Sequence, residues 1–184
     1  MAEMNSIGLV ELTSIAAGYQ AADAMLKVSD VRLLLSRSIC SGKYIVMVGG
    51  DVAAVRASVE SGTRASTGMV VDTFIIPNVH ASIFPAIAGV SRAEMLEALG
   101  IVESFSVASL IEAADAAVKT SRVELIEIRL AMALGGKAFM TMTGDVAAVT
   151  SAVDAAAAVC ADRGLLVNKV VIPNPRKELL KEMI

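Results

Sequence analysis

The chain repeats itself once, and this repeat constrains the fold more than any other feature of the sequence. Gly8-Leu9-Val10-Glu11 recurs as Gly100-Ile101-Val102-Glu103, 92 residues later. The hexapeptide that begins at Gly50 returns unchanged after 94 residues, and Ile76-Pro77-Asn78 returns after 96. Because the matches keep one order along the chain, chance does not explain them. The 184 residues are two fused copies of one fold.

The offset between matching residues grows from 92 to 94 and then to 96. The second copy therefore has two short insertions, at places that correspond to Val31–Gly42 and Val55–Gly68 of the first copy. We predict two domains, residues 1–91 with a linker at their end and residues 92–184. The linker from about Val79 to Leu99 is expected to contain a short helix of its own.

Each copy predicts the order strand, helix, strand, strand, helix, strand. A serine or threonine precedes the first helix and an aspartate the second, as expected of residues that cap helix N-termini. The fold class is therefore α/β (α+β), with each copy a small, mostly antiparallel sheet that has helices on one face. In the first copy the expected strands are Ile7–Leu12, Val31–Leu35, Lys43–Val48 and Met69–Ile76, and the second helix runs from Val52 to about Glu60.

Composition excludes several classes of function. Hydrophobic residues make up 55%, charged residues 19%, and the net charge is −3, so there is no basic field for nucleic acid. The longest uncharged stretch is interrupted by Pro77 and Pro85, which argues against a membrane span. Two cysteines make no disulfide framework, and we expect an intracellular protein without a leader segment. Its apolar surface is expected at subunit interfaces.

The order of elements, together with Gly-Leu-Val-Glu, Ala-Ala-Asp-Ala-Met-x-Lys, Gly-Asp-Val-Ala-Ala-Val and Ile-Pro-Asn, resembles the bacterial microcompartment shell domain, which has a ferredoxin-like fold. Two such domains in one chain are similar to the tandem-domain shell proteins. The resemblance covers about Ile7 to Arg176. It implies a homotrimer that mimics a hexamer, other shell proteins as partners, and a place in the microcompartment shell of the bacterial cytoplasm.

Within this family, Ser38-Ile39-Cys40-Ser41-Gly42-Lys43 is similar to a loop whose cysteine binds an iron–sulfur cluster on the trimer axis. The resemblance implies that Cys40 is a metal ligand, that Ser38, Ile39, Ser41 and Gly42 belong to the pore loop, and that one cluster, of the 4Fe-4S type, is bound per trimer. Its function would be electron transfer across the shell, with an internal or external redox partner.

Symmetry makes a single cysteine per chain sufficient. Three chains around a threefold axis bring together three copies of Cys40 if its loop lines that axis. A cubane cluster takes four thiolates, so the fourth iron would need a small ligand or be absent. Arg37 and Lys43 flank the loop and would favour the thiolate. The second copy aligns Leu134 and Gly135 with this loop and offers no ligand.

Two pairs of equivalent residues are assigned to the edge of the shell tile. Lys27 and Lys119 occupy the same place near the end of the first helix of each copy. One interpretation is a favourable contact with the helix C-terminus. The resemblance instead implies edge lysines that pack between neighbouring trimers, and we prefer this assignment. Asn78 and Asn174 stand where relatives commonly have arginine after the last strand.

Alternative functions remain open at this point. The same tile with a metal-free pore would admit small metabolites, and a trimeric ligand-binding regulator would use the duplication only for oligomer geometry. An enzyme is not expected, because no paired acids, triad or metal set recurs with usable spacing. Cys160 is interpreted as a core residue, and His80 as a solvated residue at the end of a strand.

Overall fold

The computed structural model describes residues 5–90, 93, 96–176 and 178–179. Contacts within the chain divide it into two compact units, Met1–Val79 and His80–Ile184, called unit 1 and unit 2 below. Each is described by itself.

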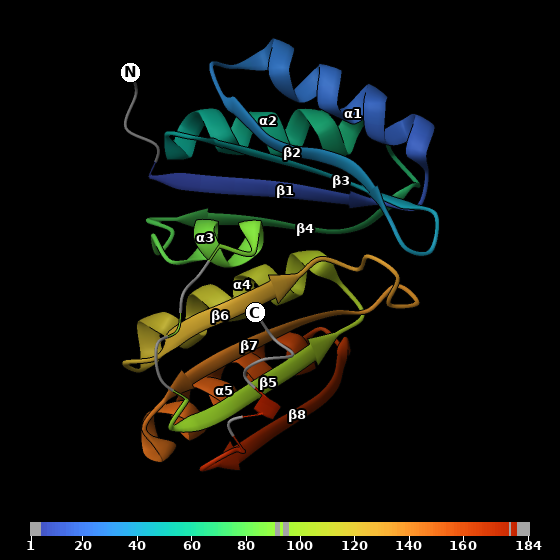
Figure 1. The fold of residues 1–184 in the computed structure, drawn as a ribbon. Helices are drawn as coiled ribbons and strands as arrows, with labels where there is room; N and C mark the ends of the chain where they lie inside the picture. Colours follow the sequence, from blue (N-terminus) through green and yellow to red (C-terminus); the bar gives the residue numbers. More distant parts are fainter. Residues whose placement is uncertain (1–4, 91–92, 94–95, 177, 180–184) are drawn as a thin grey trace. The chain divides into compact units, whose positions relative to one another are not determined.

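Unit 1 is a four-stranded antiparallel sheet with two helices on one face (Figure 1). The strand order is β2-β3-β1-β4, in which β1 lies between β3 and β4. This is the ferredoxin-like order that the resemblance implied. The elements are β1 (Ser6–Leu12), α1 (Ile15–Val28), β2 (Arg32–Ile39), β3 (Lys43–Gly50), α2 (Val52–Ala65) and β4 (Val70–Pro77).

Unit 2 repeats this topology, with the sheet order β6-β7-β5-β8. Neighbouring strands of this sheet pair antiparallel, which confirms the predicted fold class. The elements are α3 (Ile83–Ala88), β5 (Ala98–Ser104), α4 (Val107–Thr120), β6 (Glu124–Arg129), β7 (Ala138–Gly144), α5 (Val146–Asp162) and β8 (Leu166–Pro173).

The helices begin where the sequence predicts. The side chain of Asp51 accepts a hydrogen bond from the Ala54 N–H at 2.9 Å, and Asp145 repeats this contact with Ala148 at 2.9 Å. The side chains of Ser14 and Ser106 cap α1 and α4 in the same way. Each cap satisfies a backbone donor that the helix leaves unpaired, which is worth about 1 kcal/mol.

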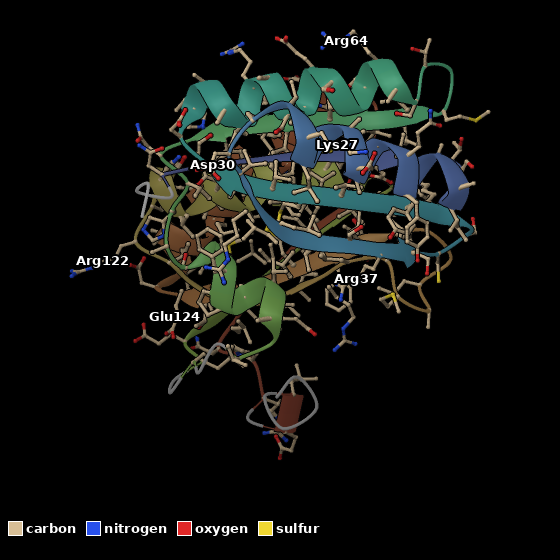
Figure 2. The ribbon with its side chains drawn as sticks, turned by 90° about the horizontal axis from the view of Figure 1, so that it is seen from above. Lys27, Asp30, Arg37, Arg64, Arg122 and Glu124 are labelled. Atoms are coloured by element: carbon tan, nitrogen blue, oxygen red, sulfur yellow. The ribbon has the colours of Figure 1, made fainter. Side chains whose placement is uncertain are left out.

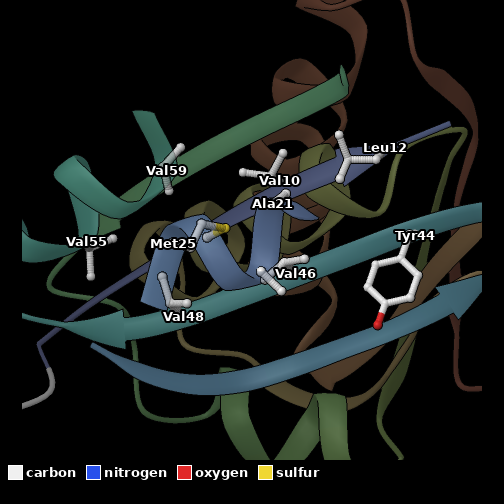
Figure 3. Close-up of a cluster of buried hydrophobic side chains, with 10 residues drawn as sticks. Val10, Leu12, Ala21, Met25, Tyr44, Val46, Val48, Val55 and Val59 are labelled. Atoms are coloured by element: carbon white, nitrogen blue, oxygen red, sulfur yellow. The ribbon is translucent and has the colours of Figure 1, made fainter. Parts of the chain in front are cut away.

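The core of unit 1 lies between the sheet and its two helices (Figure 3). A Cβ added at Gly62 of α2 would lie 2.7 Å from the Met25 side chain of α1, so the glycine lets the helices approach. A Cβ at Gly18 would lie 2.2 Å from the ring of Tyr44. The buried cluster consists of Val10, Leu12, Ala21, Ala22, Met25, Tyr44, Val46, Val48, Val55 and Val59.

The two units fill equivalent positions with different volumes. Where unit 1 has Gly18 on its first helix and Tyr44 on its third strand, unit 2 has Leu110 and Ala138, and both of these are fully buried. Unit 1 thus has a small residue on the helix and a large one on the strand, and unit 2 has the reverse. The combined volume of the two side chains stays similar. Dense cores require such compensation.

Several boundaries differ from the prediction. Strand β2 continues to Ile39 instead of ending at Leu35, and α2 continues to Ala65 instead of Glu60. The two insertions fall in the β6–β7 loop and at the end of α5. The division between units falls at Val79, whereas we placed the boundary after residue 91. Helix α3, the expected linker helix, contacts β6 and α4 and so belongs to unit 2.

Candidate functional site: the hairpin loop that carries Cys40

Cys40 lies at the start of a three-residue turn between β2 and β3. The pairing of Ile39 with Lys43 closes the hairpin below this turn. Gly42 adopts a φ of 81°, in the left-handed region that glycine reaches at little cost. Cys40 is half-buried, whereas Ser41 and Gly42 are exposed. The turn therefore combines a half-buried cysteine with two exposed residues.

A buried ion pair holds the base of the hairpin. The Lys43 ammonium contacts a carboxylate oxygen of Glu11 at 2.8 Å, and the Glu11 side chain is fully buried. We had considered Lys43 only as a charge beside the thiol. Unit 2 has the same pair, Lys137 with Glu103 at 3.0 Å, but its carboxylate is 30% exposed. The repeat alignment of Glu11 with Glu103 was the sequence signal for this pair.

Aromatic packing supports the same hairpin from the helix side. The ring of Tyr44 lies 5.2 Å from that of Tyr19 on α1, and its hydroxyl is 3.0 Å from Ser36 Oγ on β2. The neighbouring Tyr44 phenol raises the pKa of Tyr19, first through a side-chain hydrogen bond and then through charge interaction. Tyr44 thus ties α1, β2 and β3 together two strand positions from the turn.

The equivalent loop of unit 2 is longer and apolar. Eight residues, Leu130 to Lys137, connect β6 to β7. Ala131 and Ala133 have φ angles of 47° and 59°, a region that non-glycine residues rarely adopt. Leu134, which we aligned with Cys40, is half-buried, and Gly135 is exposed with a φ of 61°.

A hollow of about 290 Å³ lies beside this second loop. Its polar walls are the paired side chains of Glu103 and Lys137, and its remaining lining is apolar. The guanidinium of Arg129 lies 5.4 Å from the ring of Phe139, one of the lining residues, in a cation–π contact. The other lining residues are Ile101, Leu134 and Ala138.

Lys27 and Lys119, which the sequence analysis assigned to the edge of the tile, have different surroundings. Lys27 is 74% exposed and pairs with the exposed Asp23 at 2.6 Å. Lys119 pairs at 2.5 Å with Asp115, which is buried and also accepts a hydrogen bond from the His80 N–H at 2.8 Å. Asp115 thereby fastens the start of the linker segment to α4. Its sequence equivalent, Asp23, has only the role of an ordinary helix-surface ion pair.

The remaining predicted residues lie as follows. Asn78 and Asn174 directly follow β4 and β8, with φ angles of 52° and 47° that asparagine tolerates better than most residues. The ring of His80 is exposed, and its Nδ1 lies 2.8 Å from Ser82 Oγ. Cys160 is fully buried in α5, which confirms that it packs in the core.

One chain offers a single thiol at the hairpin tip. Among the residues that the structure describes, no group of three or more His, Cys, Asp or Glu side chains is arranged to hold a metal. Within the same described residues, no helix is both long and apolar enough to cross a membrane.

Two ferredoxin-like units with a loop at the same place in each sheet define a tandem α+β domain protein. A model of the BMC domain matches residues 6–79 and 98–175, so both units are covered. The chain belongs to the BMC-domain family of bacterial microcompartment shell proteins.

Two of the similar proteins align along nearly the whole chain. The chain is 46% identical over 179 residues to the bacterial microcompartment shell protein PduT of Citrobacter freundii. This alignment covers 97% of this chain and 97% of PduT. The crystal structure of a microcompartment protein from Desulfitobacterium hafniense superposes with a TM-score of 0.87 at 52% identity and covers 97% of this chain and 99% of the other. The shell protein EutM of Escherichia coli is 43% identical over 84 residues, which are 46% of this chain and 84% of EutM.

Proposed function

We propose that this structural shell protein forms a homotrimeric, pseudohexameric tile of a microcompartment shell in the bacterial cytoplasm, and that the three Cys40 loops meet on its axis and bind one iron–sulfur cluster. The observation that carries the proposal is the half-buried cysteine in a three-residue turn, in a chain that resembles PduT along 97% of its length. Other shell proteins would adjoin the tile.

The donor chemistry of the loop suits such a group. Thiolates are the usual ligands of iron–sulfur clusters, and the half-buried Cys40 is neither fully exposed to solvent nor enclosed in the core. Three chains supply three thiolates, so a 4Fe-4S cluster would need one ligand from outside the protein. When bound, the cluster supplies one-electron transfer, with a redox partner on either side of the shell.

The protein's own residues fix where the thiols lie. The buried Glu11–Lys43 pair and the packed ring of Tyr44 hold both strands of the hairpin, so the position of Cys40 depends on a rigid base. Preorganised ligands lose less conformational entropy when they bind. The loop of unit 2, from Leu130 to Lys137, contains no Cys, His, Asp or Glu and would only line the pore between the thiol-bearing loops.

A metal-free pore is the second candidate function. The exposed hydroxyl groups of Ser38 and Ser41 flank Cys40, and together they would give the opening a polar lining on three of its six sides. In this case small polar metabolites would pass through the axis, and Cys40 would be a small loop residue. The rest of the tile would be the same.

Anaerobic purification separates the two candidates. We expect about three or four irons per trimer, with the absorption and EPR spectra of a cluster. Cys40→Ser should lose the iron and keep the trimer, whereas Cys160→Ala, which removes the core thiol, should keep the iron. The wild-type protein without iron, even after reconstitution with iron and sulfide, would eliminate the cluster and leave the metal-free pore. Absence of a trimer would eliminate the tile itself.

A further inference from the structure

Two neighbouring surface positions have opposite charges in the two units. In unit 1, Asp30 lies in the turn after α1 and Arg32 is the first residue of β2; in unit 2, Arg122 lies in the turn after α4 and Glu124 is the first residue of β6. Each turn is taken below together with the strand residue that follows it. The acid precedes the base in unit 1, and the base precedes the acid in unit 2. Both positions are therefore inverted, while the lysine and serine just before them are the same in both copies.

The backbone confirms that the positions are equivalent. Ser29 ends α1 with φ −156° and ψ 163°, and Ser121 ends α4 with φ −144° and ψ 158°. In each turn the next-but-one N–H donates back to the serine carbonyl, from Val31 at 3.0 Å and from Val123 at 2.9 Å. The same turn thus presents opposite charges at the same two places.

All four charged side chains are exposed. Within the part of the chain that the structure describes, none of the four makes an ion pair or a side-chain hydrogen bond. In Figure 2, Arg122 and Glu124 lie at the periphery of their unit, and the Arg122 side chain extends away from it. The charges are consequently available to another molecule.

We propose that the turn of unit 1 in one molecule docks on the turn of unit 2 in a second copy of this chain, with Asp30 opposite Arg122 and Arg32 opposite Glu124. Contact between two copies of the same turn would instead place Asp30 opposite Asp30 and Arg122 opposite Arg122. The inversion thus favours unlike units and disfavours like ones. Charge complementarity of this kind selects partners and fixes register.

The proposed trimer gives this pairing a geometric setting, and the inference rests on that proposed function. Three two-unit chains in a ring alternate unit 1 with unit 2, so units on opposite sides of the ring are unlike. Rings repeated by translation in a flat layer meet through opposite sides. Each contact between neighbouring rings then joins unit 1 of one ring to unit 2 of the next, and the charges orient every ring in the same way.

The test is a charge-swap cycle on the full-length protein, read as the concentration at which purified trimers form layers at about 50 mM salt, by light scattering and electron microscopy. Asp30→Arg and Arg122→Asp should each raise this concentration roughly three- to tenfold. The double variant Asp30→Arg/Arg122→Asp restores the opposite charges and should return to within about twofold of the wild type. The effects should shrink at higher salt.

A control variant separates the local pair from the net charge. Asp30→Arg/Arg64→Asp has the same net charge as the wild type and as the double swap. In this control variant, however, the arginine introduced at position 30 still lies opposite Arg122. The concentration needed for layer formation should therefore stay raised. Asp30→Arg without effect, or with easier assembly, would overturn the inference, as would equal recovery by both double variants. A wild-type trimer that forms no layers at any concentration would overturn the inference together with the flat tile, whereas these other results leave the tile intact.

Discussion

Unit 1 and unit 2 share one topology, the same helix caps and the same Glu–Lys pair, yet they differ in their hairpin loops. Unit 1 has a three-residue turn that carries a thiol, and unit 2 has an eight-residue, largely apolar loop at the same place. The caps and the pair support the fold, so both copies retain them. The exposed part of each loop, Ser41 and Gly42 in unit 1 and residues such as Met132 and Gly135 in unit 2, lies outside the core. Duplication therefore allows one copy to change its loop chemistry while the other keeps a different surface.

The cores of the two units also differ, because unit 1 fills with Tyr44 the space that unit 2 fills with Leu110. The largest predicted effect tests this difference. Tyr44→Ala should lower the free energy of unfolding by about 3–4 kcal/mol, because it removes a buried ring that unit 2 replaces with Leu110 on the facing helix. Gly18→Leu combined with Tyr44→Ala copies the pair of unit 2 and should recover part of that loss. Urea titration followed by circular dichroism measures both. No recovery would show that the two pairs are not interchangeable.

The Glu–Lys pairs should differ in their contribution to stability. Glu11→Gln should cost about 2–3 kcal/mol, because it removes the partner of a largely buried lysine. Glu103→Gln should cost less than about 1 kcal/mol, because both members of that pair are partly exposed to water. Thermal melting of the two variants compares them directly. Equal costs would mean that the difference in burial has no energetic consequence.

The aspartate caps should behave alike in both units. Asp51→Ala and Asp145→Ala each remove one hydrogen bond to a helix N-terminus and a negative charge from its positive end. We expect a loss of about 1 kcal/mol from each, measured by chemical denaturation at neutral pH. A much larger loss in one unit would show that the shared topology conceals different stabilities of the two helices.

The smallest effect on folding is expected at the edge lysines. Lys27→Ala removes an exposed helix-surface pair, so the melting temperature should hardly change, while lateral assembly should weaken with the trimer intact. Lys119→Ala should lower stability slightly more, because Lys119 contacts the buried Asp115. Size-exclusion chromatography combined with electron microscopy separates trimer from layer. Loss of the trimer in Lys27→Ala would place this lysine at a different interface.

The repeat made most of the fold predictable, because each element was visible twice. Strand β2 was underestimated, because Ser36, Arg37 and Ser38 do not form an apolar run. In the structure β2 lies at the sheet edge, where polar side chains can face water, and Ser36 contacts the Tyr44 hydroxyl. An edge strand can therefore continue where a buried strand would have to end.

Helix α2 was underestimated for a different reason. Ser61, Gly62 and Thr63 are poor helix formers, so propensity alone ends the helix near Glu60. The structure continues it because Gly62 packs against Met25, and the Ser61 and Thr63 hydroxyls donate to backbone carbonyls. Tertiary packing here outweighs local preference.

The candidate site was predictable only in part. The strands predicted on either side of Cys40 were enough to place it in a loop. The pairing of Lys43 with the buried Glu11 could not be predicted, because a single sequence does not show which charged residue of an apolar strand has a partner. The repeat of Glu11 as Glu103 was the only trace of that contact. The different surroundings of Asp23 and Asp115 could not be predicted either. Asp115 is buried and accepts a hydrogen bond from the His80 N–H at the start of the linker, and the sequence does not show where this segment packs.

The covalent connection between the units, through the segment that contains α3, has a consequence for the make-up of the proposed ring. Two separate single-domain proteins that mixed freely would close rings of many compositions, and only a small minority would alternate strictly. Joining the two kinds of domain in one chain fixes their ratio at synthesis. Every ring of three chains then carries the same number of thiol loops and apolar loops, whatever the level of expression.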